Sequence, residues 1–150
     1  MPVDGGVLPA RLREIVEEFA TSDGRDKLQL LLEYSESLPP LPAWLRQRHG
    51  AMQRVHECMT PVAVYGERRT GGMHFYFDVP PESPTVRGYA AILGDGLEGA
   101  TPEEVLAVPD TFFQQMGLDE VLSYQRLNGM AAMLAYMKRL AVESLSQSPR

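Results

Sequence analysis

The sequence has very little cysteine: Cys58 is the only one among 150 residues. A lone cysteine cannot form an internal disulfide, so we expect a fold that needs no oxidation. A tetrahedral zinc site would have to combine this thiolate with all three histidines of the chain. No pair of these residues has the spacing of a zinc finger, so no metal site is expected.

Positive charge is also scarce, because 14 Lys and Arg stand against 20 Asp and Glu, a net charge of −6. Proteins that bind phosphate groups usually show the opposite balance. No stretch approaches the roughly 20 apolar residues of a membrane span. The first ten residues lack the basic, apolar pattern of a secretory signal. We therefore expect no nucleic-acid partner, no membrane association and a cytoplasmic location.

Hydrophobic residues are present in ordinary amount, at 44%, beside 23% charged residues. This composition is typical of a globular protein and too apolar for a disordered one. A chain of this length can bury roughly two-thirds of its unfolded surface in one core. We expect a single domain over residues 1–150, with its core at about residues 8–144.

The first part of the chain has the spacing of helices. Apolar residues recur at steps of three and four, which predicts helices at residues 9–20 and 25–38 that pair as a hairpin. The proline-rich segment at 39–42 ends the second helix. That helix is expected to bury one face, which holds Leu28, Leu31, Leu32 and Ser35.

The middle of the chain alternates apolar and polar residues with the period of two that is typical of strands, at 52–55, 61–67 and 72–79. The polar, glycine-ending connection between the last two predicts a hairpin. Helical patterns return at 84–93, from 102, from 109 to before 117, and from 123 onward. This order predicts an α+β fold: a small antiparallel three-stranded sheet with helices packed on one face.

Cys58 lies on the expected turn between the first two strands. A free cysteine is most often a small buried hydrophobe. A reactive cysteine needs nearby positive charge or hydrogen-bond donors, and the adjacent Glu57 works against the thiolate. His56 would share a face with Cys58 if this segment were extended. The residues alone leave both interpretations open, an inert cysteine and a reactive one.

The start of the last helix is the second candidate site. Gly129 lies one turn into the helix, where glycine costs about 1 kcal/mol relative to alanine and lets another backbone approach closely. Arg126 and Asn128 add donors at a helix N-terminus. The alternative is a solvated Arg126 and a glycine kept for packing. Arg87, early in the middle helix, is by itself more typical of a surface charge.

Three segments together resemble the SufE family, the sulfur acceptors of cysteine desulfurases: Val55–Val62 around the cysteine, Thr85–Gly88, and Ser123–Met130. The resemblance covers about residues 8–144. Two positions depart from the family pattern, because Glu57 stands where glycine is common and Met59 where a polar residue is common. The related IscU-type scaffolds hold iron–sulfur clusters through three cysteines, and a chain with one cysteine lacks those ligands.

The resemblance implies a SufE/IscU-like fold and a sulfur carrier of iron–sulfur cluster assembly. Cys58 would take persulfide sulfur from a PLP-dependent, SufS-like cysteine desulfurase, stimulate that enzyme, and pass the sulfur to a SufBCD-like scaffold. The protein would be a sulfurtransferase-like accessory without stand-alone turnover and without a cofactor, because the PLP belongs to the partner. The residues expected to form the pocket or contact the partner are Arg126, Asn128, Gly129, Arg87 and His56.

Three other functions remain open at this stage. The protein could be an activator that binds the desulfurase while another thiol takes the sulfur. It could be a stand-alone thiol enzyme that uses Cys58 with His56 as its base. It could also be an interaction module with an inert cysteine. For the carrier, we expect Cys58 to be largely buried in the free protein, because an exposed persulfide is lost to reductants and oxidants.

Overall fold

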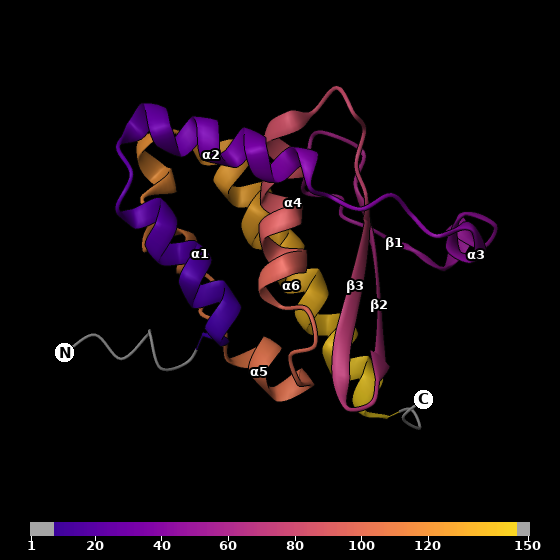
Figure 1. The fold of residues 1–150 in the computed structure, drawn as a ribbon. Coiled ribbons are helices and arrows are strands. Elements are labelled where there is room, and N and C mark those ends of the chain that lie inside the picture. The colour runs from indigo at the N-terminus through magenta and orange to yellow at the C-terminus, as the bar shows by residue number, and fades with distance from the viewer. Residues whose placement is uncertain (1–7, 147–150) are drawn as a thin grey trace.

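Two helices open the part of the chain that the computed structural model describes, residues 8–146 (Figure 1). They are α1 (Ala10–Ala20) and α2 (Gly24–Glu36). Asp23 ends the break between them by accepting a hydrogen bond from the Asp26 N–H at 3.0 Å, as an N-cap does. The helices meet at Tyr34, whose ring centroid lies 5.8 Å from that of Phe19.

The buried face of α2 differs from the expected one. Leu31 and Ser35 are buried, but Leu28 and Leu32 are 42% and 41% exposed. Lys27 is buried in place of Leu28. Its ammonium group donates to the Ser22 carbonyl and lies 3.6 Å from a Glu120 carboxylate oxygen. A buried ammonium group is tolerated when it is paired in this way. The apolar spacing could not reveal that a lysine stem lies in the core.

The sheet is a meander of β1 (Gln53–Arg54), β2 (Ala63–Arg69) and β3 (Gly72–Asp78), antiparallel and in that order. This confirms the expected three-stranded sheet, although β1 is shorter than residues 52–55. The hairpin turns through only two residues, Thr70 and Gly71, with φ of 54° and 86°. Positive φ at both positions matches the right-handed twist of the flanking strands, which fixes the register from the Arg69–Gly72 pair onward.

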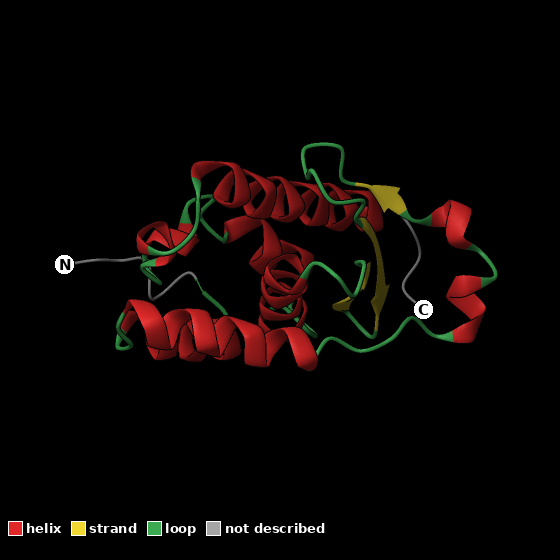
Figure 2. Cartoon of the chain, turned by 90° about the horizontal axis from the view of Figure 1, so that it is seen from above, coloured by secondary structure: helices red, strands yellow, loops and turns green. Residues whose placement is uncertain are grey.

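The two faces of the sheet are covered unequally. Val64, Phe75 and Phe77 are buried on the face that packs against α4 (Pro84–Gly96) and α6 (Tyr124–Leu145). The opposite face carries Tyr65 and Tyr76, and Trp44 of the short α3 (Ala43–Arg46) packs edge-on against both rings. Figures 1 and 2 show α3 beyond the strands, on the side away from the other helices. The expected one-sided packing therefore holds for every long helix.

α4 is the central helix, since α1, α2, α6 and β3 all contact it. It is three residues longer than the expected 84–93. Gly88 allows the closest of these contacts: a Cβ at this position would lie 2.5 Å from the Leu31 carbonyl oxygen. Any side chain there would push α2 away from α4, so the glycine sets their spacing.

The remaining segments complete one continuous core. α5 (Pro102–Ala107) begins with a capping box formed by Thr101 and Glu104. The helix expected from residue 109 to before residue 117 is wrong: that stretch contains the single 3-10 turn η3 (Phe112–Gln114). A second such turn, η4 (Leu118–Glu120), follows it, and another, η2 (His49–Ala51), precedes β1. Within residues 8–146, no helix combines the length and apolarity needed to cross a membrane.

Candidate functional site

The loop between β1 and β2 carries Cys58. Its base is closed by a hydrogen bond from the Val55 N–H to the Val62 carbonyl at 2.9 Å, and both valines are buried. The Cys58 N–H donates to the Val55 carbonyl at 3.3 Å, so residues 55–58 form a tight turn. Further along, the hydroxyls of Thr60 and Ser83 lie 3.3 Å apart and connect the loop to the start of α4. The cysteine is thus presented on a short loop fixed at both ends.

The side chain of Cys58 is half-buried between α4 and α6. Its Sγ lies 3.7 Å from the Gly129 carbonyl oxygen, which can accept from the S–H, and 3.9 Å from the Tyr89 hydroxyl oxygen. Gly129 is needed for this arrangement, because a Cβ there would lie 3.2 Å from Sγ and 3.1 Å from the Tyr89 oxygen. The structure therefore brings Gly129 to the cysteine.

The surroundings of the thiol favour its protonated form. Burial raises the pKa of Cys58, a hydrogen bond with Tyr89 lowers it, and the Glu57 carboxylate raises it, with a net increase. Burial also raises the pKa of Tyr89, so this phenol keeps its proton and remains a donor. Cys58 in the free protein is therefore a sheltered thiol and not an activated thiolate.

Arg126 and Asn128 occupy the first turns of α6, and both are exposed. The Arg126 N–H donates to the capping hydroxyl of Ser123 at 3.3 Å. The guanidinium charge of Arg126 acts to lower the pKa of Tyr89, so it lies on the Cys58 side of the molecule. Both residues lie on the surface of α6, whereas Gly129 faces the cysteine seat, which we define by Tyr89 and Gly129.

Arg87 and His56 are placed differently from the other candidates. Arg87 donates through Nη1 to the Val79 carbonyl at 2.9 Å, which ties the first turn of α4 to the end of β3. His56 is exposed within the turn at residues 55–58. The segment is a turn, as expected, so the extended arrangement that would put His56 on the face of Cys58 does not occur. The side-chain hydrogen-bond contacts of Sγ found within residues 8–146 are those to Tyr89 and Gly129.

Tyr89 is the residue of this site that the sequence analysis missed. It is 2% exposed and lies three residues after Val86 and four before Leu93 on the buried side of α4. The signal was present, because a tyrosine within an apolar helical stripe brings a hydroxyl that needs a partner in the core. What the sequence could not show is that this partner is the sulfur of Cys58.

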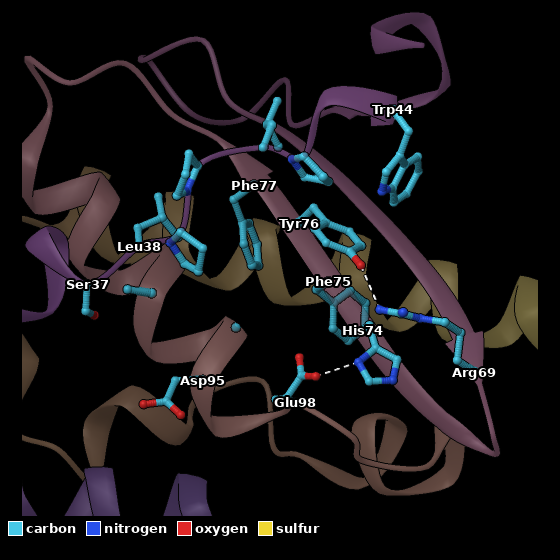
Figure 3. A pocket seen from close by; sticks show the side chains of 16 residues that line it. Ser37, Leu38, Trp44, Arg69, His74, Phe75, Tyr76, Phe77, Asp95 and Glu98 are labelled. Atoms are coloured by element: carbon cyan, nitrogen blue, oxygen red, sulfur yellow. Dashed lines mark hydrogen bonds and ion pairs between the residues drawn. The ribbon is translucent and has the colours of Figure 1, made fainter. Parts of the chain in front are cut away.

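A cleft of about 590 Å³ lies away from the cysteine (Figure 3). Its walls are the proline-rich segment at 38–42, Trp44, β3 and the end of α4. The polar groups at its rim are paired, with Glu98 2.5 Å from His74 and the Arg69 guanidinium donating to the Tyr76 hydroxyl at 2.8 Å. Cys58 does not line it. The part of the chain that the structure describes has no cluster of three or more His, Cys, Asp and Glu that could hold a metal ion.

Comparisons with known proteins show which family and which fold the chain resembles. The SufE family model, an Fe-S metabolism associated domain, matches residues 13–141. A SufE-like protein of Mycobacterium tuberculosis is 43% identical over 133 residues, covering 88% of this chain and 92% of that protein. The cysteine desulfuration protein SufE of Plasmodium vivax is 27% identical over 147 residues, covering 95% of this chain and 57% of that protein. The solution structure of a hypothetical protein from Thermus thermophilus matches with a TM-score of 0.84 at 36% identity, over 93% of this chain and 99% of that one.

These findings confirm the resemblance that three short motifs had indicated, and they confirm the α+β fold. The family model spans most of the chain, and the mycobacterial relative matches across nearly the full length of both proteins. The chain therefore belongs to the SufE family and has a role in Fe–S metabolism.

Proposed function

We propose that this protein is a sulfur carrier that accepts persulfide sulfur on Cys58 from a PLP-dependent cysteine desulfurase. The observation that carries the proposal is the position of the chain's only thiol, on a fixed loop with its sulfur seated between Tyr89 and Gly129. Membership of the SufE family and the name of the Plasmodium relative, a cysteine desulfuration protein, support it. The PLP belongs to the desulfurase, and this chain contributes the acceptor thiol.

The transfer is a thiol–disulfide type of exchange. The Cys58 thiolate attacks the outer sulfur of the partner's persulfide, a new S–S bond forms at Cys58, and the partner's S–S bond breaks. Cys58–S⁻ and partner–S–SH become Cys58–S–SH and partner–S⁻, so charge and protons balance without an added oxidant. One proton must leave the Cys58 thiol before the attack.

The sheltered thiol explains why such a carrier needs its partner. Burial and Glu57 hold the pKa of Cys58 above its ordinary value, so the free protein has little thiolate at neutral pH. A desulfurase that brings positive charge or hydrogen-bond donors to Cys58, with its sulfur still seated at Tyr89, would lower this pKa. The same seat protects the sulfur between encounters. We therefore expect slow reaction of the free protein and rapid reaction in the complex.

A docking surface is available beside the cysteine. Met59, the residue after Cys58, is 78% exposed, and Tyr124, two residues before Arg126, is 84% exposed. Exposed large apolar side chains next to a functional residue are typical of protein contact sites. Arg126 and Asn128 add polar groups to the same helix end. We assign the desulfurase contact to this surface.

The test is direct transfer. The protein is incubated with a SufS-like cysteine desulfurase and free cysteine, and its intact mass is measured before and after reduction. We expect one added sulfur atom on the wild-type protein, removed by the reductant, and none on Cys58→Ser. Normal desulfurase turnover with no sulfur on Cys58 would overturn the carrier function. Full stimulation by Cys58→Ser would instead favour the pure activator.

The docking surface has its own test. Tyr124→Ser should raise the carrier concentration needed for half-maximal stimulation and leave the melting temperature unchanged, because this side chain is exposed. Leu28→Ser is a matched control, since Leu28 is an exposed apolar side chain on α2. We further propose that the sulfur goes to a SufBCD-like scaffold, and that the carrier acts in the cytoplasm, where thiols are kept reduced.

A further inference from the structure

The hydroxyl of Tyr89 has an unusual position for a core side chain. The ring lies in α4 among buried residues, and within residues 8–146 the hydrogen-bond partner found for its oxygen is the Cys58 sulfur at 3.9 Å. A phenylalanine would fill the same space without bringing a polar group into the core. The tyrosine therefore places a hydroxyl where a hydrophobic residue would suffice for packing.

The two polar neighbours of Sγ favour opposite states of the sulfur. The Gly129 carbonyl can only accept, so it pairs with the protonated thiol. The Tyr89 hydroxyl can donate, and its own proton is held firmly because burial raises its pKa. When Sγ loses its proton, the Gly129 contact is lost and Tyr89 becomes the donor to the anion. Hydrogen bonds to charged acceptors are the stronger kind.

Sulfur carriage puts negative charge on Sγ twice. Cys58 is a thiolate when it attacks the partner's persulfide. It is again a thiolate when an acceptor thiolate attacks the outer sulfur, because Cys58–S–SH and acceptor–S⁻ then become Cys58–S⁻ and acceptor–S–SH. We propose that Tyr89 is a catalytic residue of both steps, whose hydroxyl donates a hydrogen bond to the Sγ thiolate, before its attack in the first step and as it leaves in the second. This catalytic role rests on the proposed carrier function. The hydrogen bond from the Tyr89 hydroxyl to the Cys58 thiolate does not depend on that function.

Two charged groups also act on Cys58 and Tyr89, so a test of the Tyr89 hydroxyl must leave both groups unchanged. Glu57 on the loop opposes the thiolate, and Arg126 on α6 acts on Tyr89. Tyr89→Phe changes neither of them and keeps the ring in place. It isolates the hydroxyl.

The first measurement is alkylation of Cys58 by iodoacetamide across a pH series, which needs no partner. For Tyr89→Phe we expect the midpoint to move to higher pH, and the rate at pH values below it to fall by about tenfold. Tyr34→Phe is the matched control, since it removes a phenol that donates to Glu18 in α1, and its midpoint should equal that of the wild type. A lower melting temperature for Tyr89→Phe with an unchanged midpoint would show a purely structural hydroxyl and overturn the inference.

The second measurement is single-turnover sulfur loading from the desulfurase. Slower loading of Tyr89→Phe at saturating partner is expected, and wild-type loading despite a shifted midpoint would overturn the catalytic role. If the wild type gains no sulfur while the midpoint still shifts, the carrier function fails and the thiolate contact stands. Should Tyr89→Phe not fold, 3-fluorotyrosine can replace all six tyrosines. A stronger phenol donor should then move the midpoint down, and an unchanged midpoint would contradict the proposal.

Discussion

Replacing Gly129 by alanine should release Cys58 from its seat. The added Cβ would lie 3.2 Å from Sγ and 3.1 Å from the Tyr89 oxygen, both tighter than ordinary contacts. Tyr89 is anchored in the core, so it has little freedom to retreat. The Cys58 loop is the neighbour that can move, because it lies at the surface and Met59 beyond it is exposed.

The size of the effect follows from two opposing contributions. Overpacking of this kind costs about 1–3 kcal/mol, and alanine in place of glycine inside a helix stabilises by about 1 kcal/mol. The difference leaves a loss of global stability of at most about 2 kcal/mol, so the melting temperature should fall by no more than about 8 °C. The overpacking is relieved only when the loop opens. A shift of about 1.4 kcal/mol toward the open loop raises the reaction rate of the thiol tenfold.

The assay is the rate of Cys58 alkylation by iodoacetamide at fixed pH, with thermal unfolding measured on the same samples. Gly50→Ala is the control, because a Cβ at Gly50 meets no atom within 4 Å. We expect Gly129→Ala to react up to about tenfold faster than both the wild type and the control. An unchanged or slower rate, or a large fall in melting temperature, would show that Gly129 does not hold the loop closed.

Three further predictions concern the thiol and the helices that hold it. The pH midpoint of Cys58 alkylation should be higher in the folded wild type than in the urea-unfolded chain. Burial disfavours the thiolate and raises the pKa of Cys58, so the thiol becomes reactive only as pH rises through that value. Equal midpoints in the two states would contradict this. Gly88→Ala should lower the free energy of unfolding by about 1–3 kcal/mol in urea titrations, since its Cβ would meet the Leu31 carbonyl oxygen at 2.5 Å, and no loss would mean that α2 shifts freely. Thr101→Ala should cost about 1 kcal/mol by removing the capping hydroxyl of α5, with Thr101→Ser retaining most of the stability.

The parts of the fold that were predictable are those governed by local periodicity. Alternation at 61–67 predicted β2, and alternation at 72–79 predicted β3. The capping residue Ser123 and the apolar stripe that follows it predicted α6. The predictions failed where a side chain is not buried or exposed as its residue type usually is. Lys27 is buried through its paired ammonium group, so the face of α2 was wrong. The segment from residue 109 was wrong because its apolar residues pack into the core from single turns.

The site was predictable in part for a similar reason. Cys58 and Gly129 stood out because each is rare in its setting, one as the only thiol and the other as a glycine inside a long helix. The seat that joins them depends on α4 and α6 coming together at the loop, and no local pattern shows which helices pack on each other. Tyr89 was missed on that account. Arg87 looked like a free surface charge, but its guanidinium group is used to hold the end of β3.

The packing of Trp44 against Tyr65 and Tyr76 has a practical consequence for work in solution. It is the only tryptophan of the chain, so the indole fluorescence of the protein arises entirely from the outer face of the sheet. The only thiol lies apart from it, between α4 and α6. A dye attached at Cys58 and the natural indole thus form a donor–acceptor pair, and energy transfer between them would follow the movement of the loop without any engineered label site.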